Sequence, residues 1–97
     1  MVIISKAILA EFGVKHGDSV EALNKWYTDT KQANWNTLSN VKQSFNNVDF
    51  VGNDRFVFNI KGNKYRLVAM IFFSIRTVYI RFIGTHAEYN KVDCTTI

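Results

Sequence analysis

The distribution of apolar and polar residues divides the chain into two parts with different periods. From about residue 55 onward, apolar and polar positions alternate with a period of two, which is the pattern of half-buried β-strands. Gly62-Asn63 interrupts this alternation with the composition of a two-residue hairpin loop, and a second turn is expected near Ser74-Ile75. From Phe56 to Tyr89 the pattern therefore predicts a three-stranded antiparallel meander.

The first part of the chain has the 3.6-residue period of amphipathic helices. Three helices are predicted, over about residues 5–16, 18–31 and 37–45. Ser5 is the candidate cap of the first, and Asp18 begins a capping-box spacing, completed by Glu21, that opens the second. Before these helices, the short apolar run Val2–Ile4 is expected to join the later sheet as an edge strand.

The first hairpin loop also determines which residues lie opposite each other in the meander. Asn59 is expected opposite Arg66, and Val57 opposite Val68. If the second loop also has two residues, it gives the pairs Val68–Arg81, Met70–Tyr79 and Leu67–Phe82.

On this register the two faces of the sheet differ in chemistry. One face is apolar and is expected to pack under the helices: Phe56, Phe58, Ile60, Leu67, Ile80 and Phe82. The other carries polar and cationic residues over a floor of Val57, Val68 and Met70: Asn59, Lys61, Lys64, Arg66, Tyr79 and Arg81. The sequence therefore predicts an α+β fold with the N-terminal helices packed on one face of an antiparallel β-sheet and a basic concave opposite face.

Length and composition indicate one globular domain spanning residues 1–97. Apolar residues make up 47% and charged residues 21% of the chain, and proline is absent. The most apolar run, Leu67–Ile75, has nine residues, whereas a helix that crosses a bilayer needs about 20. The single cysteine, Cys94, is ordinary for a reducing compartment. We therefore expect a cytoplasmic protein with no membrane partner.

The net charge of +4 is concentrated in the second half of the chain. Residues 1–49 hold five lysines and five acids, whereas residues 50–97 hold seven cations, including all four arginines, and three acids. Arginine has a planar fork of donors that suits phosphate, so this segregation favours an anionic partner on the sheet. Charge alone is equally compatible with a role in solubility.

The cationic cluster has the groups that metal-free RNA cleavage requires. Such cleavage needs a base for the 2′-hydroxyl, an acid for the leaving 5′-oxygen, and cations for the charge that grows on the phosphate. Arg66 and Arg81 supply cations, and histidine side chains titrate near neutral pH, so His86 suits an acid or a base. If Thr85 caps a short terminal helix, His86 and Tyr89 share one face of it. Tyr79 and Tyr89 are also able to stack on bases.

Each of these residues also has a purely structural interpretation. Arg66 is able to pair with Asn59 or Glu88, and lysines beside a turn are often solvated charges. His86, taken alone, is an ordinary helix-start residue. Four further residues are interpreted as structural or inert: His16, Trp26, Trp35 and Cys94.

Other chemistries lack the residues that they need. Two separated histidines and one cysteine give no zinc-ligand spacing, and no glycine-rich phosphate loop or GxSxG motif is present. We therefore expect no metal and no cofactor.

Two strings carry a resemblance to a known family: VFNIKGNKYRLVAMIFF and, after a short interval, YIRFIGTHAEY. Together they closely resemble the HigB toxins of bacterial toxin–antitoxin systems, within the RelE-like superfamily. The resemblance implies an mRNA endonuclease that acts on the ribosome and is silenced by a HigA-type antitoxin. It also implies that the antitoxin has a helix-turn-helix domain, and that operator DNA is bound only through the toxin–antitoxin complex.

The resemblance bears on individual residues as well. Arg66 matches the mid-strand arginine of the RelE-like pattern, and His86 and Tyr89 sit where these toxins place terminal catalytic groups. The expected catalytic set is Arg66, His86 and Tyr89, and the expected RNA-binding set is Asn59, Lys61, Lys64, Tyr79 and Arg81. The alternative is a non-catalytic module that uses the same basic face to bind RNA or a protein partner.

Overall fold

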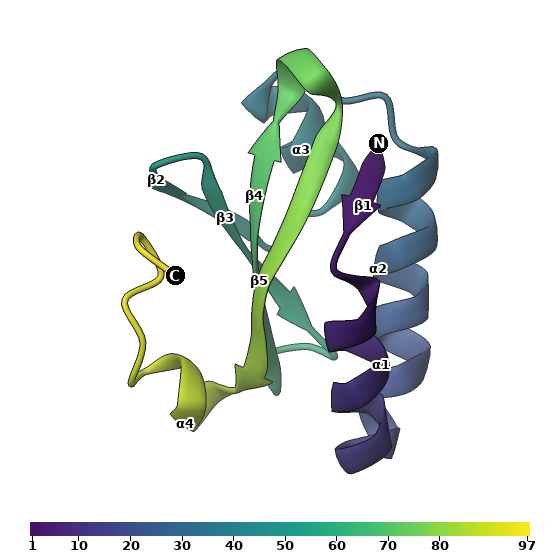
Figure 1. Cartoon of the computed structure of the whole chain (residues 1–97), viewed down its shortest axis with the longest axis vertical. Coiled ribbons are helices and arrows are strands. Elements are labelled where there is room, and N and C mark those ends of the chain that lie inside the picture. Colours follow the sequence, from purple (N-terminus) through teal and green to yellow (C-terminus); the bar gives the residue numbers. More distant parts are fainter.

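The computed structural model describes all 97 residues and has two layers. Its elements are β1 (Val2–Ile4), α1 (Lys6–Lys15), α2 (Val20–Gln32), α3 (Leu38–Ser44), β2 (Val48–Gly52), β3 (Arg55–Ile60), β4 (Tyr65–Phe72), β5 (Thr77–Thr85) and α4 (His86–Tyr89). Helices α1 and α2 lie together on one side of the sheet, and α4 with the segment that follows it lies on the other (Figure 1). None of the helices is long and apolar enough to span a membrane.

The five strands form one mixed sheet in the order β1-β5-β4-β3-β2. The predicted antiparallel meander is β3-β4-β5, and β1 joins its edge, as expected. β1 runs parallel to β5, however, so the sheet is mixed and not antiparallel throughout. The α+β class is therefore confirmed. Strand β2 was not predicted, because it is a short edge strand in which Phe50 is exposed, so the period of two is lost.

The first hairpin has the predicted register. Asn59 lies opposite Arg66, and Val57 lies opposite Val68. Gly62 has a φ of 64°, and the Lys64 amide donates to the Lys61 carbonyl oxygen at 3.2 Å, so the turn closes around Gly62 and its neighbour. The predicted register holds because a tight turn determines pairing locally.

The second hairpin departs from the predicted register. Met70 does lie opposite Tyr79, but a β-bulge leaves Arg81 without a partner and places Phe82 opposite Val68. Phe82 is therefore on the face of Val68, and Ile83 takes the place opposite Leu67 that was predicted for Phe82. The bulge lets Ile80 and Ile83, three residues apart, both reach the core while Arg81 stays exposed.

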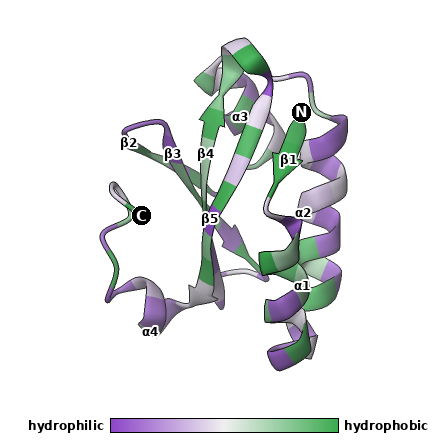
Figure 2. Cartoon of the chain, in the orientation of Figure 1, coloured by the Kyte–Doolittle hydropathy of each residue, from purple (hydrophilic) through white to green (hydrophobic).

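The core lies between the helices and the sheet. The helices contribute Leu9 from α1 and Leu23 and Trp26 from α2. The sheet contributes residues that include Phe58 and Leu67. The rings of Trp26 and Phe58 meet edge to face, with their centroids 5.4 Å apart. Figure 2 shows the corresponding apolar stretches along β1 and β4, whereas α2 alternates between apolar and polar residues. Trp26 and Trp35 are each 2% exposed, which confirms their predicted structural role.

Two of the predicted helix caps are wrong. Ser5 precedes α1 but its side chain makes no capping hydrogen bond. Helix α2 begins at Val20, after a 3₁₀ turn at Gly17–Ser19, so Asp18 is not its cap. The predicted cap at Thr85 is present, because Thr85 and Glu88 form a reciprocal capping box at α4.

Asp18 instead connects the helical layer to the β3–β4 hairpin. Its carboxylate accepts a hydrogen bond from the Tyr65 hydroxyl at 2.5 Å and another from the amino group of Lys64. The amino group of Lys61 lies 3.6 Å from the same carboxylate and donates to the Asp18 backbone carbonyl at 3.1 Å. The pKa of Asp18 is lowered from 3.8 to about 2. The hydrogen bond from Lys64 is the largest cause, and the hydrogen bond from Tyr65 is the second.

This lowered pKa predicts a difference between the wild-type protein and Asp18→Asn in acid. A carboxylate with a depressed folded-state pKa stabilises the fold above its unfolded pKa, and the stabilisation is lost as the pH falls through the folded pKa. Between pH 3.8 and about 2 the wild-type protein should therefore lose more unfolding free energy than Asp18→Asn. Urea denaturation at several pH values measures this, and equal losses in the two proteins would contradict the role of Asp18.

Candidate active site

The site face is the face of the sheet opposite α1 and α2. By register it carries the row Asn59–Arg66–Gly84 and the row Val57–Val68–Phe82. Arg66 is the second residue of β4, one position from the hairpin rather than in mid-strand. Gly84, opposite Arg66, lets the Phe82 ring pack directly against the backbone, because a Cβ atom there would lie 2.5 Å from that ring.

Arg66 has no acidic partner. Its Nη1 donates to the Asn63 carbonyl oxygen at 3.2 Å, and its Cζ lies 5.9 Å from the centre of the Tyr89 ring. The structural alternative, a pairing with Asn59 or Glu88, is not what the structure shows. The chain's three ion pairs all join a lysine to an aspartate, so no arginine pairs with the side chain of an aspartate or glutamate. A half-buried guanidinium in this state is suited to an anionic ligand.

Helix α4 places Tyr89 against Arg66. The partly buried Tyr89 hydroxyl donates to Cys94 Sγ at 3.5 Å. His86, at the start of α4, is exposed, and its Nδ1 lies 3.2 Å from Asn90 Nδ2. The structure therefore brings Arg66 and Tyr89 together, whereas the polar contact of His86 is with its own helix end.

The contact with Cys94 was not expected from the sequence. Cys94 was interpreted as an inert thiol, because a cysteine in a terminal segment gives no local signal of what it touches. The pKa of Tyr89 is raised to about 12. The hydrogen bond to Cys94 is the largest cause, and burial of the phenol is the second. The charge of Arg66 acts in the opposite direction. At neutral pH Tyr89 therefore holds its proton, and it releases that proton less readily than a free tyrosine does.

The segment after α4 returns along the site face. Arg55 Nε donates to the Ile97 carbonyl oxygen at 2.7 Å, and Asn53 Nδ2 donates to the Thr95 carbonyl oxygen at 3.1 Å. The predicted floor residues Val57 and Val68 are only 3% and 0% exposed. These two floor residues are therefore covered within the chain, whereas Met70, Asn59 and Arg66 stay partly exposed.

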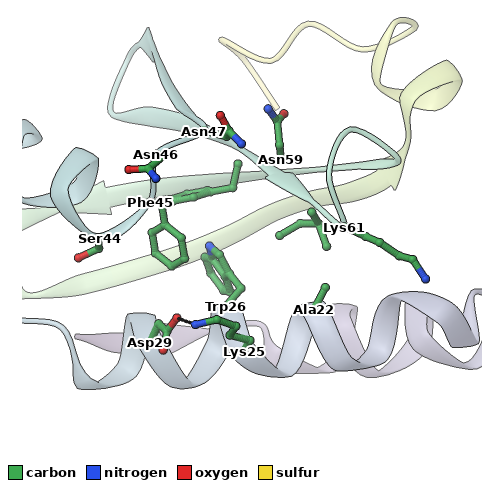
Figure 3. Close-up of a pocket in the computed structure, with 12 residues that line it drawn as sticks. Ala22, Lys25, Trp26, Asp29, Ser44, Phe45, Asn46, Asn47, Asn59 and Lys61 are labelled. Atoms are coloured by element: carbon green, nitrogen blue, oxygen red, sulfur yellow. Dashed lines mark hydrogen bonds and ion pairs between the residues drawn. The ribbon is translucent and has the colours of Figure 1, made fainter.

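The predicted RNA-binding residues do not form one cluster around Arg66. Figure 3 shows Asn59 and Lys61 leaving β3 in opposite directions, with Lys61 on the side of the helices. The cause is the backbone of Lys61, whose φ of 53° ends the strand alternation. The prediction that Lys61 shares a face with Asn59 is therefore wrong, and both turn lysines are bound to Asp18.

The remaining predicted residues are further along the sheet. Tyr79 packs edge to face against Phe72, with the ring centres 5.7 Å apart, and Arg81 is exposed on the bulge. Asn59 also lines a cavity of about 320 Å³ between α2 and β3, next to Asn46 and Asn47 (Figure 3).

The contacts of Tyr89 predict opposite effects of two substitutions on its pKa. Cys94→Ala should lower the pKa, because it removes the acceptor that stabilises the protonated phenol. Arg66→Ala should raise it, because it removes a cation that stabilises the phenolate. An NMR pH titration of the Tyr89 ring carbons measures both shifts. Shifts of the same sign would contradict the proposed contacts.

Comparison with known proteins agrees with the resemblance to HigB toxins that the two sequence strings carry. Residues 19–92 match the model of the HigB toxin family, described as the RelE-like toxic component of a toxin–antitoxin system. An mRNA interferase HigB of Escherichia coli O6:H1 is 32% identical over 94 residues, which cover 95% of this chain and 91% of that protein.

Two further relatives match a shorter segment. The mRNA interferase toxin HigB of Escherichia coli (strain K12) and the mRNA interferase HigB of Shigella flexneri are each 41% identical over 54 residues. That segment covers 56% of this chain and 51% of each relative. The breadth of the family match and of the first alignment shows that this chain belongs to the HigB family of RelE-like toxins, the toxic components of toxin–antitoxin systems.

Proposed function

We propose that this toxin is a metal-independent endoribonuclease that cleaves mRNA on the ribosome. The observation that carries the proposal is the Arg66–Tyr89 pair: a guanidinium without an acidic partner lies over the ring of a protonated phenol. The names of the relatives, which describe mRNA interferases, support the same activity.

In the proposed reaction the RNA 2′-hydroxyl attacks the adjacent phosphorus, and the 5′-oxygen leaves. Arg66 stabilises the negative charge that grows on the phosphate oxygens. Tyr89 gives its proton to the leaving 5′-oxygen, for which its hydroxyl must leave Cys94. His86, exposed at the start of α4, takes the proton of the 2′-hydroxyl. Asn59, Tyr79 and Arg81 bind neighbouring nucleotides along the same face.

The partners follow from the same proposal. The toxin is held silent by a HigA-type antitoxin with a helix-turn-helix domain, and operator DNA is bound only through that complex. The substrate is mRNA on the ribosome, so the site of action is the cytoplasm. Membership of a toxin–antitoxin family supports an antitoxin partner in general terms.

The alternative is a non-catalytic module that binds RNA or a protein partner through the same residues. It is favoured by one observation, namely that the Tyr89 hydroxyl is bonded to Cys94 and His86 contacts Asn90 rather than Arg66. The two proposals differ in whether the RNA is cut.

The first test of the function is Arg66→Ala. Loss of one cation directed at the transition state should reduce cleavage by about 10²–10³-fold, as for removal of an oxyanion-hole donor. Induced expression should then no longer arrest growth, while circular dichroism shows an intact fold. Arg66→Lys should rescue poorly, because a point charge cannot replace a bidentate fork. Full growth arrest by folded Arg66→Ala would remove Arg66 from the mechanism.

The second test concerns the products of cleavage. Ribosome-programmed cleavage should proceed in excess EDTA and leave a 2′,3′-cyclic phosphate or the 3′-phosphate derived from it, because the attacking group is the RNA's own 2′-hydroxyl. His86→Ala combined with Tyr89→Phe should abolish cleavage but retain ribosome binding. A 5′-phosphate product would refute this mechanism. Binding without any cleavage by the wild-type protein would support the alternative module.

A further inference from the structure

The tip of the β3–β4 hairpin holds a carboxylate among its cations. The sequence places Lys61 and Lys64 beside the turn and assigns Asp18 to a helix cap, 43 and 46 residues away. In the structure Asp18 binds both amino groups and accepts the hydroxyl of Tyr65 at 2.5 Å. Two amines and one hydroxyl around a single anion is also the arrangement that a phosphate group would attract.

The carboxylate is held more firmly than the lysines are. Tyr65 is 2% exposed and is fixed by edge-to-face contacts with Phe12 and His16, at 5.2 and 5.4 Å between ring centres. The side chains of Lys61 and Lys64 are 47% and 56% exposed. Because exposed ion pairs are weak and lysine side chains are flexible, these amines are able to leave Asp18 for a competing anion.

The turn is continuous with the candidate active site. Asn63, between the two lysines, accepts the hydrogen bond of Arg66 at 3.2 Å. The amines of Lys61 and Lys64 lie beyond this turn, on the side of Asp18, so an RNA strand bound at Arg66 would reach them by continuing around the hairpin tip.

We propose that Lys61 and Lys64 form a masked phosphate site, in which Asp18 occupies the position of an RNA phosphate until the RNA displaces it. The inference rests on the proposed function, because it takes RNA as the ligand of the neighbouring Arg66. Its consequence is that Asp18 lowers the affinity of the toxin for RNA, by keeping two cations occupied in the unbound protein. A purely structural Asp18 would not have this effect on binding.

The direct test is the affinity of Asp18→Asn for a labelled single-stranded oligoribonucleotide, followed by fluorescence anisotropy between about 50 and 200 mM salt. The amide oxygen of asparagine still accepts the Tyr65 hydroxyl, so the fold should be kept. Each phosphate contact on a single strand contributes about 0.7 to the slope of log affinity against log salt. Asp18→Asn should therefore bind about fivefold more tightly at ~0.1 M salt, with a slope steeper by about 0.7–1.4.

Asp29→Asn is the matched control. Asp29 pairs with Lys25 at 2.7 Å on α2, and its exposure of 39% is close to the 35% of Asp18, so the substitution makes the same change in net charge and also frees a lysine. It should change RNA affinity by less than about twofold, because exposed charges away from the binding face are screened. An equal gain in both variants would show a general charge effect and overturn the proposal.

Substituting the two lysines tests whether Asp18 keeps them from RNA, and this test does not rely on Asp18→Asn alone. Lys61→Gln with Lys64→Gln should cost little affinity in the wild-type chain, where the amines are occupied, but should remove the whole gain in the Asp18→Asn chain. A fivefold loss in the wild-type chain, or an unchanged or weaker affinity of folded Asp18→Asn, overturns the proposal. These readouts are binding only, so they stand whether or not Arg66→Ala abolishes growth arrest, which tests the catalytic assignment.

Discussion

The burial of β4 on both of its faces is the constraint on which the fold and the candidate site depend. β4 is the central strand, with β5 and β3 on its two sides, and Leu67, Val68 and Ala69 are fully buried. Such a strand admits a charged side chain only where it comes out of the core. Arg66 occupies that position, one residue from the hairpin, and so projects from an element that is paired on both sides. A site mounted on such an element is held more precisely than one on a loop.

Asp18 links the two layers at the end of this strand. A carboxylate between the helices accepts the hydroxyl of Tyr65, whose ring is part of the core, and also binds the turn lysines. The same contact therefore bears on stability, through a depressed carboxyl pKa, and on the charge that the hairpin presents to a ligand. Lys61 adopts a left-handed backbone conformation at this point, which directs its amine toward Asp18 and away from the face of Asn59.

The segment after β5 raises the pKa of Tyr89. Thr85 and Glu88 form a reciprocal capping box at the start of α4. The helix that it begins places the Tyr89 ring against the guanidinium of Arg66. Cys94 then accepts the phenolic hydrogen and raises the pKa of Tyr89, while Arg66 lowers it. Two neighbours therefore act in opposite directions on the pKa of one phenol.

The sequence by itself determined the features that depend on local rules. The alternation of residues 55–60 and the Gly62 turn place Asn59 opposite Arg66, and the spacing of Thr85 and Glu88 predicts the cap of α4. Only the tertiary structure decided the bulge at Arg81, the partners of Asp18 and the bond from Tyr89 to Cys94. The bulge arises because Ile80 and Ile83 must both reach a core whose helical half lies far away in the sequence. Asp18 has the spacing of a helix cap, but it binds Tyr65 because folding brings a buried hydroxyl 47 residues away to its carboxylate.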